Sequence, residues 1–192
     1  MAAQRQTFVT PEEYLEQERK AEFKSEYMSG EVIAMSGASL VHTTIVGNIV
    51  EGLGPVLRKR GCRAHSNDLR VQIQRTGAYV YPDVVIVCGQ PRLADSHMDT
   101  LLNPTVIIEV RSPSTGDYDS GPKWAHYRRL ESLAAYVMIA QDEPLVEVYT
   151  RHADVWVYSE TTDMDASLDL PSVDAAVSLS EIYDGVNFPT KG

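Results

Sequence analysis

Three apolar runs set the strongest limit on how this chain can fold. The segments YVYPDVVIV (79–87), TVIIEVRS (105–112) and AAYVMIAQ (134–141) are almost continuous stretches of β-branched and other apolar residues. Such runs are typical of strands covered on both faces, because a strand with one wet face would alternate polar and apolar residues. We therefore expect a central sheet with helices packed against both faces.

Helices and hairpins are expected between and around these strands. Capping residues and helical spacing predict helices near residues 11–23, 42–59 and 120–133, the last one capped by Ser120. Turn residues predict hairpins that reverse at Gly30 and at 152–154. This order predicts one mixed sheet flanked by helices, an α/β fold (α+β in the sense of a mixed sheet).

The length of 192 residues favours a single domain spanning 1–192. Within it we expect an N-terminal helix and hairpin (1–41), a core (42–141), and a C-terminal hairpin followed by an acidic tail (142–192). No run of roughly 18 apolar residues suggests a membrane span. The two cysteines match no metal or redox spacing, so a cytoplasmic protein with reduced thiols is expected.

The net charge of −10 bears on the class of partner. Proteins that bind nucleic acid without sequence preference usually carry a basic surface, because neutralising phosphates supplies most of their affinity. This chain is acidic overall, which lowers the expectation of a nucleic-acid partner but leaves room for a local basic groove. Carboxylates gathered to hold a divalent cation would fit the same balance.

Asp83 and Glu109 are the most informative residues, because each is the lone acid in a strongly apolar strand. An isolated carboxylate is costly in such a setting unless it is hydrogen-bonded, paired or bound to a metal. Pro82 lacks a backbone donor and places Asp83 at a strand start, an edge or a bulge. Two neighbouring strands could bring the two acids together, and Mg²⁺ suits one or two carboxylates. A solvent-facing acid or an ion-pair partner is the alternative.

Four further residues are candidates for the same site. Lys123 lies near the start of a helix, where the dipole gives a cation no benefit, so an acid or a phosphate would explain it. His42 leads the long predicted helix, and Glu26 and Glu31 flank the turn at Gly30. Each of the four also has an ordinary reading as a capping or solvated residue.

The segments YPDVVIV and IIEV, in this order, resemble the PD-(D/E)xK nuclease signature. The chain is more closely similar to the Uma family of restriction-endonuclease-like proteins of bacteria. That resemblance rests on TPEEYL, EYMSGEVIAMSGAS, YPDVVIVC, EVRSPST and SLSEIYDGV, and it covers most of the chain. The order and spacing of these segments together are specific to the family.

The resemblance implies a restriction-endonuclease-like core with its acids at one end of a mixed sheet. Asp83 and Glu109 would then ligate Mg²⁺ or Mn²⁺, which polarises the scissile phosphate and activates a water. A lysine would stabilise the charge that develops on the phosphate. Double-stranded DNA would be the substrate, and a homodimer would supply the two sites that a double-strand cut needs.

The chain departs from the simplest form of the signature at Arg111, which stands where the lysine is usual. Arginine carries charge but is a poor proton acceptor. Members of the Uma family commonly carry the lysine in the next helix, and Lys123 matches that place. Asp83, Glu109 and Lys123 are therefore the predicted catalytic residues. The possible supporting residues are His42, Glu26, Glu31, Arg111 and Tyr127.

Three functions remain open from the sequence. The first is a metal-dependent endonuclease that hydrolyses DNA phosphodiester bonds. The second is a non-catalytic, dimeric accessory module on the nuclease scaffold, which the acidic balance favours. The third is a metal-dependent hydrolase of other phosphoesters, which would use the same site chemistry.

Overall fold

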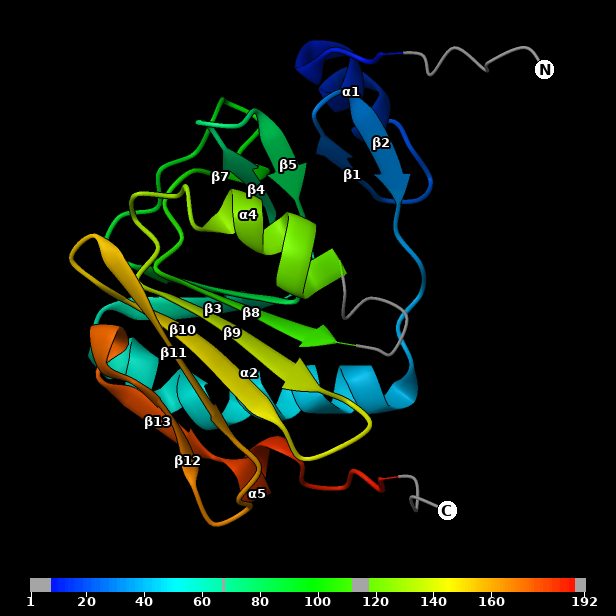
Figure 1. The fold of residues 1–192 in the computed structure, drawn as a ribbon. Coiled ribbons are helices and arrows are strands. Elements are labelled where there is room, and N and C mark those ends of the chain that lie inside the picture. The colour runs from blue at the N-terminus through cyan, green and yellow to red at the C-terminus, as the bar shows by residue number, and fades with distance from the viewer. Residues whose placement is uncertain (1–7, 67, 112–117, 189–192) are drawn as a thin grey trace.

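The computed structural model describes residues 8–66, 68–111 and 118–188. Its centre is a six-stranded mixed sheet in which only β8 and β9 run parallel (Figure 1). In sheet order its strands are β11 (Val155–Thr161), β10 (Val146–His152), β9 (Ala135–Ala140), β8 (Val106–Arg111), β6 (Val84–Cys88) and β3 (Cys62–Ser66). β6, β8 and β9 are the three predicted apolar runs, and nearly all of their residues are buried.

A second sheet of five strands lies on one side of the main sheet, next to α1 (Pro11–Glu18) (Figure 1). In sheet order its strands are β2 (Glu31–Ala34), β1 (Ser25–Met28), β5 (Ala78–Val80), β4 (Arg70–Ile73) and β7 (Thr100–Leu101). The expectation of one sheet is therefore wrong. The run YVYPDVVIV splits between the two sheets, because Pro82 offers no N–H to a strand neighbour and the chain turns there.

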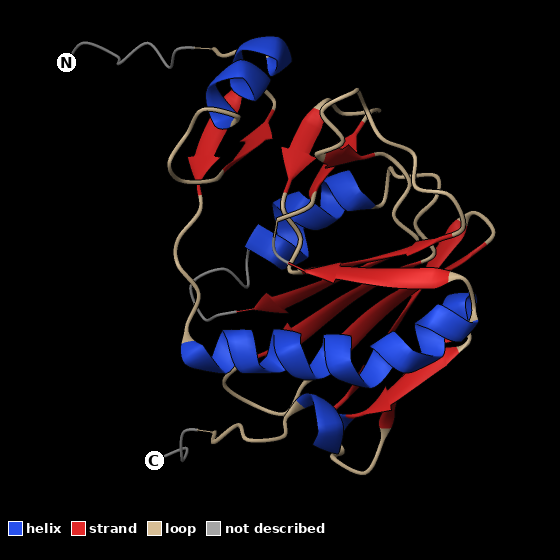
Figure 2. Cartoon of the chain, turned by 180° about the vertical axis from the view of Figure 1, so that it is seen from behind, coloured by secondary structure: helices blue, strands red, loops and turns tan. Residues whose placement is uncertain are grey.

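The long helix α2 (Leu40–Lys59) covers the opposite face of the main sheet (Figure 2). Its stripe of Ile45, Ile49, Leu53 and Leu57 is fully buried in the larger hydrophobic core. The Gly54-Pro55 pair does not end the helix, which continues to Lys59. α2 is long and apolar enough to cross a membrane, but its buried stripe packs as that of a core helix does.

A third, two-stranded sheet and two short helical turns lie beside α2 and complete the same core. These elements are β12 (Ser167–Leu170), η2 (Pro171–Val173), β13 (Ala175–Ser178) and α5 (Leu179–Ile182). The approach to α2 is close: a Cβ at Gly52 would lie 2.9 Å from Cγ2 of Val177. The short helix in SLSEIY is thus confirmed, whereas the β12–β13 hairpin lies in the expected acidic tail and was not predicted. The predicted hairpin that reverses at 152–154 is confirmed as β10–β11 of the main sheet.

The predicted helix near 120–133 is shorter than expected and begins differently. A π-helical turn, η1 (Asp119–Lys123), leads directly into α4 (Trp124–Tyr127), and Ser120 is not its N-cap. Pro122 lies inside the π turn and supplies no backbone donor there. By contrast, the first predicted helix has the expected capping box between Thr10 and Glu13.

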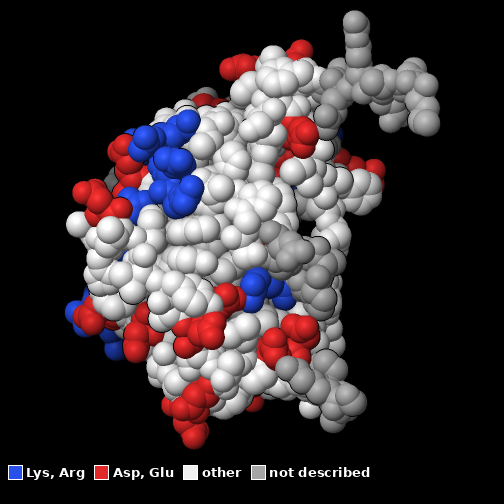
Figure 3. All heavy atoms as spheres, in the orientation of Figure 1, with Lys and Arg blue, Asp and Glu red and all other residues white. Residues whose placement is uncertain are grey.

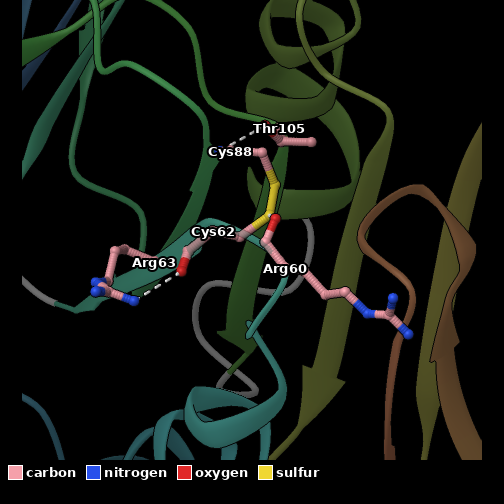
Figure 4. The surroundings of a disulfide bond; sticks show 5 residues. All are labelled: Arg60, Cys62, Arg63, Cys88 and Thr105. Carbon is pink, nitrogen blue, oxygen red and sulfur yellow. Dashed lines mark hydrogen bonds between the residues drawn. A yellow bond between two sulfur atoms is a disulfide. The ribbon is translucent and has the colours of Figure 1, made fainter. Parts of the chain in front are cut away.

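The two cysteines are joined, contrary to the prediction of reduced thiols. Cys62 on β3 stands opposite Cys88 on β6, and the two form a disulfide with their Cα atoms 4.0 Å apart (Figure 4). Their 26-residue separation gave no sign of this, because only the pairing of β3 with β6 brings them together. Disulfides persist mainly in oxidising compartments, so the cysteines do not support the cytoplasmic expectation.

Candidate active site

Glu109 is the centre of a buried polar cluster at one end of the main sheet. It lies on β8, is 3% exposed, and points its Oε1 atom at two donors. The ammonium of Lys123 donates to Oε1 at 3.0 Å, and the Tyr127 hydroxyl donates to the same atom at 2.7 Å. The η1–α4 segment therefore returns both residues to the sheet end, as the sequence predicted for Lys123.

Asp83 and Glu109 lie side by side, and the carboxylate of each accepts a hydrogen bond from a backbone N–H of the other's strand segment. The Asp83 N–H donates to Oε2 of Glu109 at 3.3 Å, and the Val110 N–H donates to Oδ2 of Asp83 at 2.7 Å. Asp83 stands just before β6 begins, at the irregular position that Pro82 predicted. The two lone acids of the apolar strands thus meet, as expected from their neighbouring strands.

His42 forms a hydrogen bond with the carboxylate of Asp83. Its Nε2 atom lies 2.9 Å from Oδ1 of Asp83, and the two side chains are 16% and 18% exposed. Ser39 caps the N-terminus of α2 and so fixes the turn from which His42 projects. Burial lowers the pKa of His42, but the hydrogen bond and charge of Asp83 outweigh burial and raise it above its ordinary value.

Glu26 and Asp119 bring two further carboxylates to Lys123. The ammonium lies 3.1 Å from Oε1 of Glu26 and 3.6 Å from Oδ1 of Asp119. Glu26 is itself held by donation from the Tyr81 N–H and the Tyr118 hydroxyl, each at 3.0 Å. The cluster therefore joins the second sheet to the main one through a single lysine.

The cluster contains more acidic than basic side chains, and burial together with these charges shifts the pKa values of Glu109 and Lys123. Burial raises the pKa of Glu109 to about 8; the ammonium of Lys123 opposes this rise, while the charges of Asp83, Asp119 and Glu26 add to it. Burial alone would lower the pKa of Lys123, yet the surrounding carboxylates raise it well above its ordinary value. Burial is thus the main cause of the raised pKa of Glu109, and the neighbouring carboxylates are the cause of the raised pKa of Lys123.

This excess of carboxylates fits a divalent cation. Within residues 8–66, 68–111 and 118–188, no three His, Cys, Asp or Glu side chains are grouped so that they could hold a metal by themselves. Mg²⁺ needs fewer protein ligands, because it keeps several waters and is commonly bound by one or two carboxylates. Asp83 and Glu109 supply two adjacent ones, of which Asp83 is partly open to solvent.

Two of the predicted supporting residues lie apart from the cluster. Arg111 forms an ion pair with Glu147 on β10, so it does not take the role of the missing lysine. Glu31 is exposed beside the hairpin turn, whereas Glu26 reaches Lys123. The segment SPSTGD (112–117) that follows Arg111 lies outside the described residues.

Sequence reasoning missed Asp119 and Tyr118 as members of the cluster. Asp119 precedes Lys123 by four residues, a spacing that brings two side chains together on a helix and could have revealed the pair. Tyr118 gave no comparable signal, because its contact with Glu26 joins positions 92 residues apart.

Comparison with known proteins gives consistent matches. The model of the Uma2 family, described as "Putative restriction endonuclease", matches residues 11–180. Two uncharacterized proteins of Synechocystis, sll1609 and slr1290, are 32% identical over 162 residues and 31% identical over 181 residues. These alignments cover 84% and 94% of this chain, and 92% and 94% of those proteins.

A solved structure is similar to the whole fold. It is the crystal structure of a protein from Anabaena variabilis described as a putative nuclease belonging to DUF820, with a TM-score of 0.77 and 21% identity. The match covers 93% of this chain and 99% of that chain. At this identity the likeness concerns the fold, and it agrees with the predicted restriction-endonuclease-like architecture.

Proposed function

The chain belongs to the Uma2 family, and from this premise we propose that it is a metal-dependent endonuclease acting on double-stranded DNA. The family and the solved nuclease-like fold support a nuclease-like function. Mg²⁺ or Mn²⁺ as cofactor, DNA as substrate and a homodimer as the active form are further parts of the proposal. The divalent ion is inferred from the chemistry of the cluster, DNA from the nuclease family, and the homodimer from the two sites that a double-strand cut needs.

The observation that carries the proposal is the convergence of Asp83, Glu109 and Lys123. The residues come from the position before β6, from β8 and from η1. The Lys123 ammonium lies 3.0 Å from Oε1 of Glu109, and the Asp83 backbone N–H donates to Oε2 of Glu109 at 3.3 Å. The Asp83 carboxylate accepts from the N–H of Val110, the residue after Glu109. Two carboxylates and an ammonium at one point are the groups that phosphodiester hydrolysis requires. A cluster with only a structural role would not need an excess of buried acids.

Each residue then has a defined part. Asp83 and Glu109 would hold the divalent ion, which supplies polarisation of the phosphate and a water of lowered pKa. Lys123 would stabilise the charge that develops on the phosphate oxygens. Tyr127 and Glu26 hold Glu109 and Lys123 in place, and His42 holds Asp83.

The surface charge leaves room for a polyanion despite the net charge of −10. Figure 3 shows Lys and Arg side chains gathered in one area at the upper left of the view, while acidic side chains are spread over several areas. A local basic area can contact phosphates even on an acidic protein, because screening limits the reach of distant charges to roughly 10 Å. The net charge therefore does not exclude DNA as a substrate class.

A cleavage assay tests the proposal. Supercoiled and linear duplex DNA would be incubated with the full chain in Mg²⁺, Mn²⁺ or EDTA. Asp83→Asn and Lys123→Met are expected to lose cleavage by about 100-fold or more. Their matched controls are Asp68→Asn and Lys20→Met, which change exposed residues and should cleave normally. Wild-type protein that cuts no DNA with any divalent ion would contradict the proposal, as would an Asp83→Asn variant of full activity.

One observation favours a second function, a non-catalytic interaction module. Lys123 is only 6% exposed, and three carboxylates surround its ammonium, so a phosphate would have to displace an existing partner. DNA affinity separates the two functions: a nuclease should bind DNA with a clear dependence on salt, and a protein-binding module with none. Cleavage of a simple phosphodiester without cleavage of DNA would point instead to a hydrolase of other phosphoesters.

A further inference from the structure

The strand β11 forms an open edge of the main sheet. All seven of its residues pair with β10, and within the described residues no strand pairs with its other side. Along that side, alternate N–H and C=O groups have no sheet partner. An edge of this kind is a template on which a further strand can form hydrogen bonds.

β11 carries one charged residue, Glu160, and otherwise lacks the features by which proteins usually protect an edge. Such protection comes from Lys, Pro, a bulge or a very short strand. The sequence VWVYSET contains neither Lys nor Pro, and its register with β10 is unbroken. The other edge strands β3, β2 and β7 are shorter. Val155, Val157 and Tyr158 on β11 are exposed by 60%, 50% and 44%.

We propose that two copies of this chain associate through β11, paired antiparallel about a two-fold axis at Tyr158. The main sheet would then continue across the interface from one copy to the other. Pairing of this kind is isologous, so the same residues serve on both sides and every contact occurs twice. This inference names the surface for the homodimer that the proposed function includes. Association is measured without a substrate, so a failure of this inference can be told apart from a failure to cleave DNA.

Charge complementarity argues that the partner is a second copy. On the face that carries Trp156 and Tyr158, the guanidinium of Arg151 lies 4.5 Å from the centre of the Trp156 ring. The acids Glu147 and Glu160, both within hydrogen-bond distance of the Tyr158 hydroxyl, stand opposite each other at the other end of this face. Arg111 forms an ion pair with Glu147, so the charge that this end presents to a partner is mainly that of Glu160, opposite in sign to Arg151 at the other end.

Antiparallel pairing about Tyr158 brings the acidic end of this face in one copy next to the basic end of the same face in the other copy. It places Trp156 opposite Glu160 of the partner subunit, which puts that carboxylate on the same face as Arg151, one strand beyond Trp156. These opposite charges attract each other across the Trp156 position. A register centred on Val157 would instead place Glu160 opposite Asp154 of the partner subunit, and like charges in cross-strand neighbours oppose pairing. Of these two registers, the charges therefore favour the one about Tyr158.

The first experiment measures association by sedimentation equilibrium of the full chain, from micromolar to hundred-micromolar concentration. Wild-type protein is expected to be a dimer. Val157→Lys should raise the dimer dissociation constant at least about ten-fold, because a lysine on an edge strand blocks pairing. Val32→Lys is the matched control: Val32 is 44% exposed on the edge strand β2 and its substitution should leave the dimer unchanged.

A second pair of variants keeps the test interpretable if Val157→Lys fails to fold. Glu160→Arg should weaken the dimer by repelling Arg151 of the partner subunit, whereas Glu51→Arg makes the same change on an exposed position of α2 and should not. A monomeric wild type would overturn the proposal. A dimer of equal strength in both Val157→Lys and Glu160→Arg would also overturn it.

The register is tested by cross-linking. Tyr158→Cys should form an intermolecular disulfide on mild oxidation, because residues directly opposite on antiparallel strands have Cβ atoms roughly 5 Å apart. Val155→Cys should not, since the two copies of that position would be roughly 20 Å apart in this register. Cross-linking of Val155→Cys in preference to Tyr158→Cys would refute the pairing about Tyr158.

Discussion

Replacing Glu109 by Gln should change how the stability of the metal-free protein depends on pH. Burial raises the pKa of this carboxyl from 4.5 to about 8, so between these values the folded protein holds a proton that the unfolded chain has released. The unfolded state then binds fewer protons, and the free energy of unfolding falls as pH rises. Glutamine does not titrate, so this loss is absent from the variant.

The magnitude follows from one proton per molecule. Each pH unit inside the window lowers the free energy of unfolding by about 1.4 kcal/mol. From about pH 5.5 to about pH 7.5, Glu109→Gln should therefore gain about 3 kcal/mol on the wild type. The raised pKa of His42 also makes stability fall as pH rises, but that group is present in both proteins and largely cancels in the difference.

Urea denaturation in EDTA, followed by circular dichroism at several pH values, provides the measurement. Glu51→Gln is the control: this residue is exposed on α2, so its stability profile should run parallel to that of the wild type. A Glu109→Gln profile that also runs parallel to the wild type would refute the reasoning. It would mean that Glu109 is ionised in the folded protein across the whole range.

Three further predictions follow from the same structure. Tyr127→Phe removes the buried donor to Glu109 and should cost about 1 to 3 kcal/mol of stability in urea denaturation; an unchanged midpoint would contradict the contact. Replacing both Cys62 and Cys88 by Ser opens a 26-residue loop and should cost about 3 kcal/mol, read as a lower melting temperature; equal melting would show that the disulfide does not form. Arg111→Lys, which restores the residue of the simplest signature, should not rescue cleavage in Lys123→Met, because Arg111 is held by Glu147; recovery of activity would contradict that placement.

Much of the central sheet could be predicted because its strands are buried on both faces. Runs such as VVIV and VIIEV have few alternatives to a covered strand, and the lone acids Asp83 and Glu109 stand out against them. Lys123 could be predicted to return to the same point through the resemblance to the Uma family. The three residues lie together as expected, with Glu109 in contact with both the Lys123 ammonium and the Asp83 backbone.

The features that could not be predicted depend on contacts between distant segments. The separation of two sheets at Pro82, the bond between Cys62 and Cys88, and the contact of Tyr118 with Glu26 all depend on how strands pair in space. Periodicity describes which face of an element is buried but not which neighbour buries it. The π turn before α4 could not be predicted, because its residues also fit the start of an ordinary α-helix.

The central claim is that Asp83 and Glu109 hold a divalent ion beside Lys123, and a crystal soaked in Mn²⁺ tests it most directly. Anomalous scattering from manganese would locate the ion without reference to the protein density. The account predicts one peak bound to carboxylate oxygens of Asp83 and Glu109, with water completing its coordination, and no such peak in Asp83→Asn. A cluster that remains free of Mn²⁺ in the wild-type crystal, with Lys123 still bound to Glu109, would contradict it.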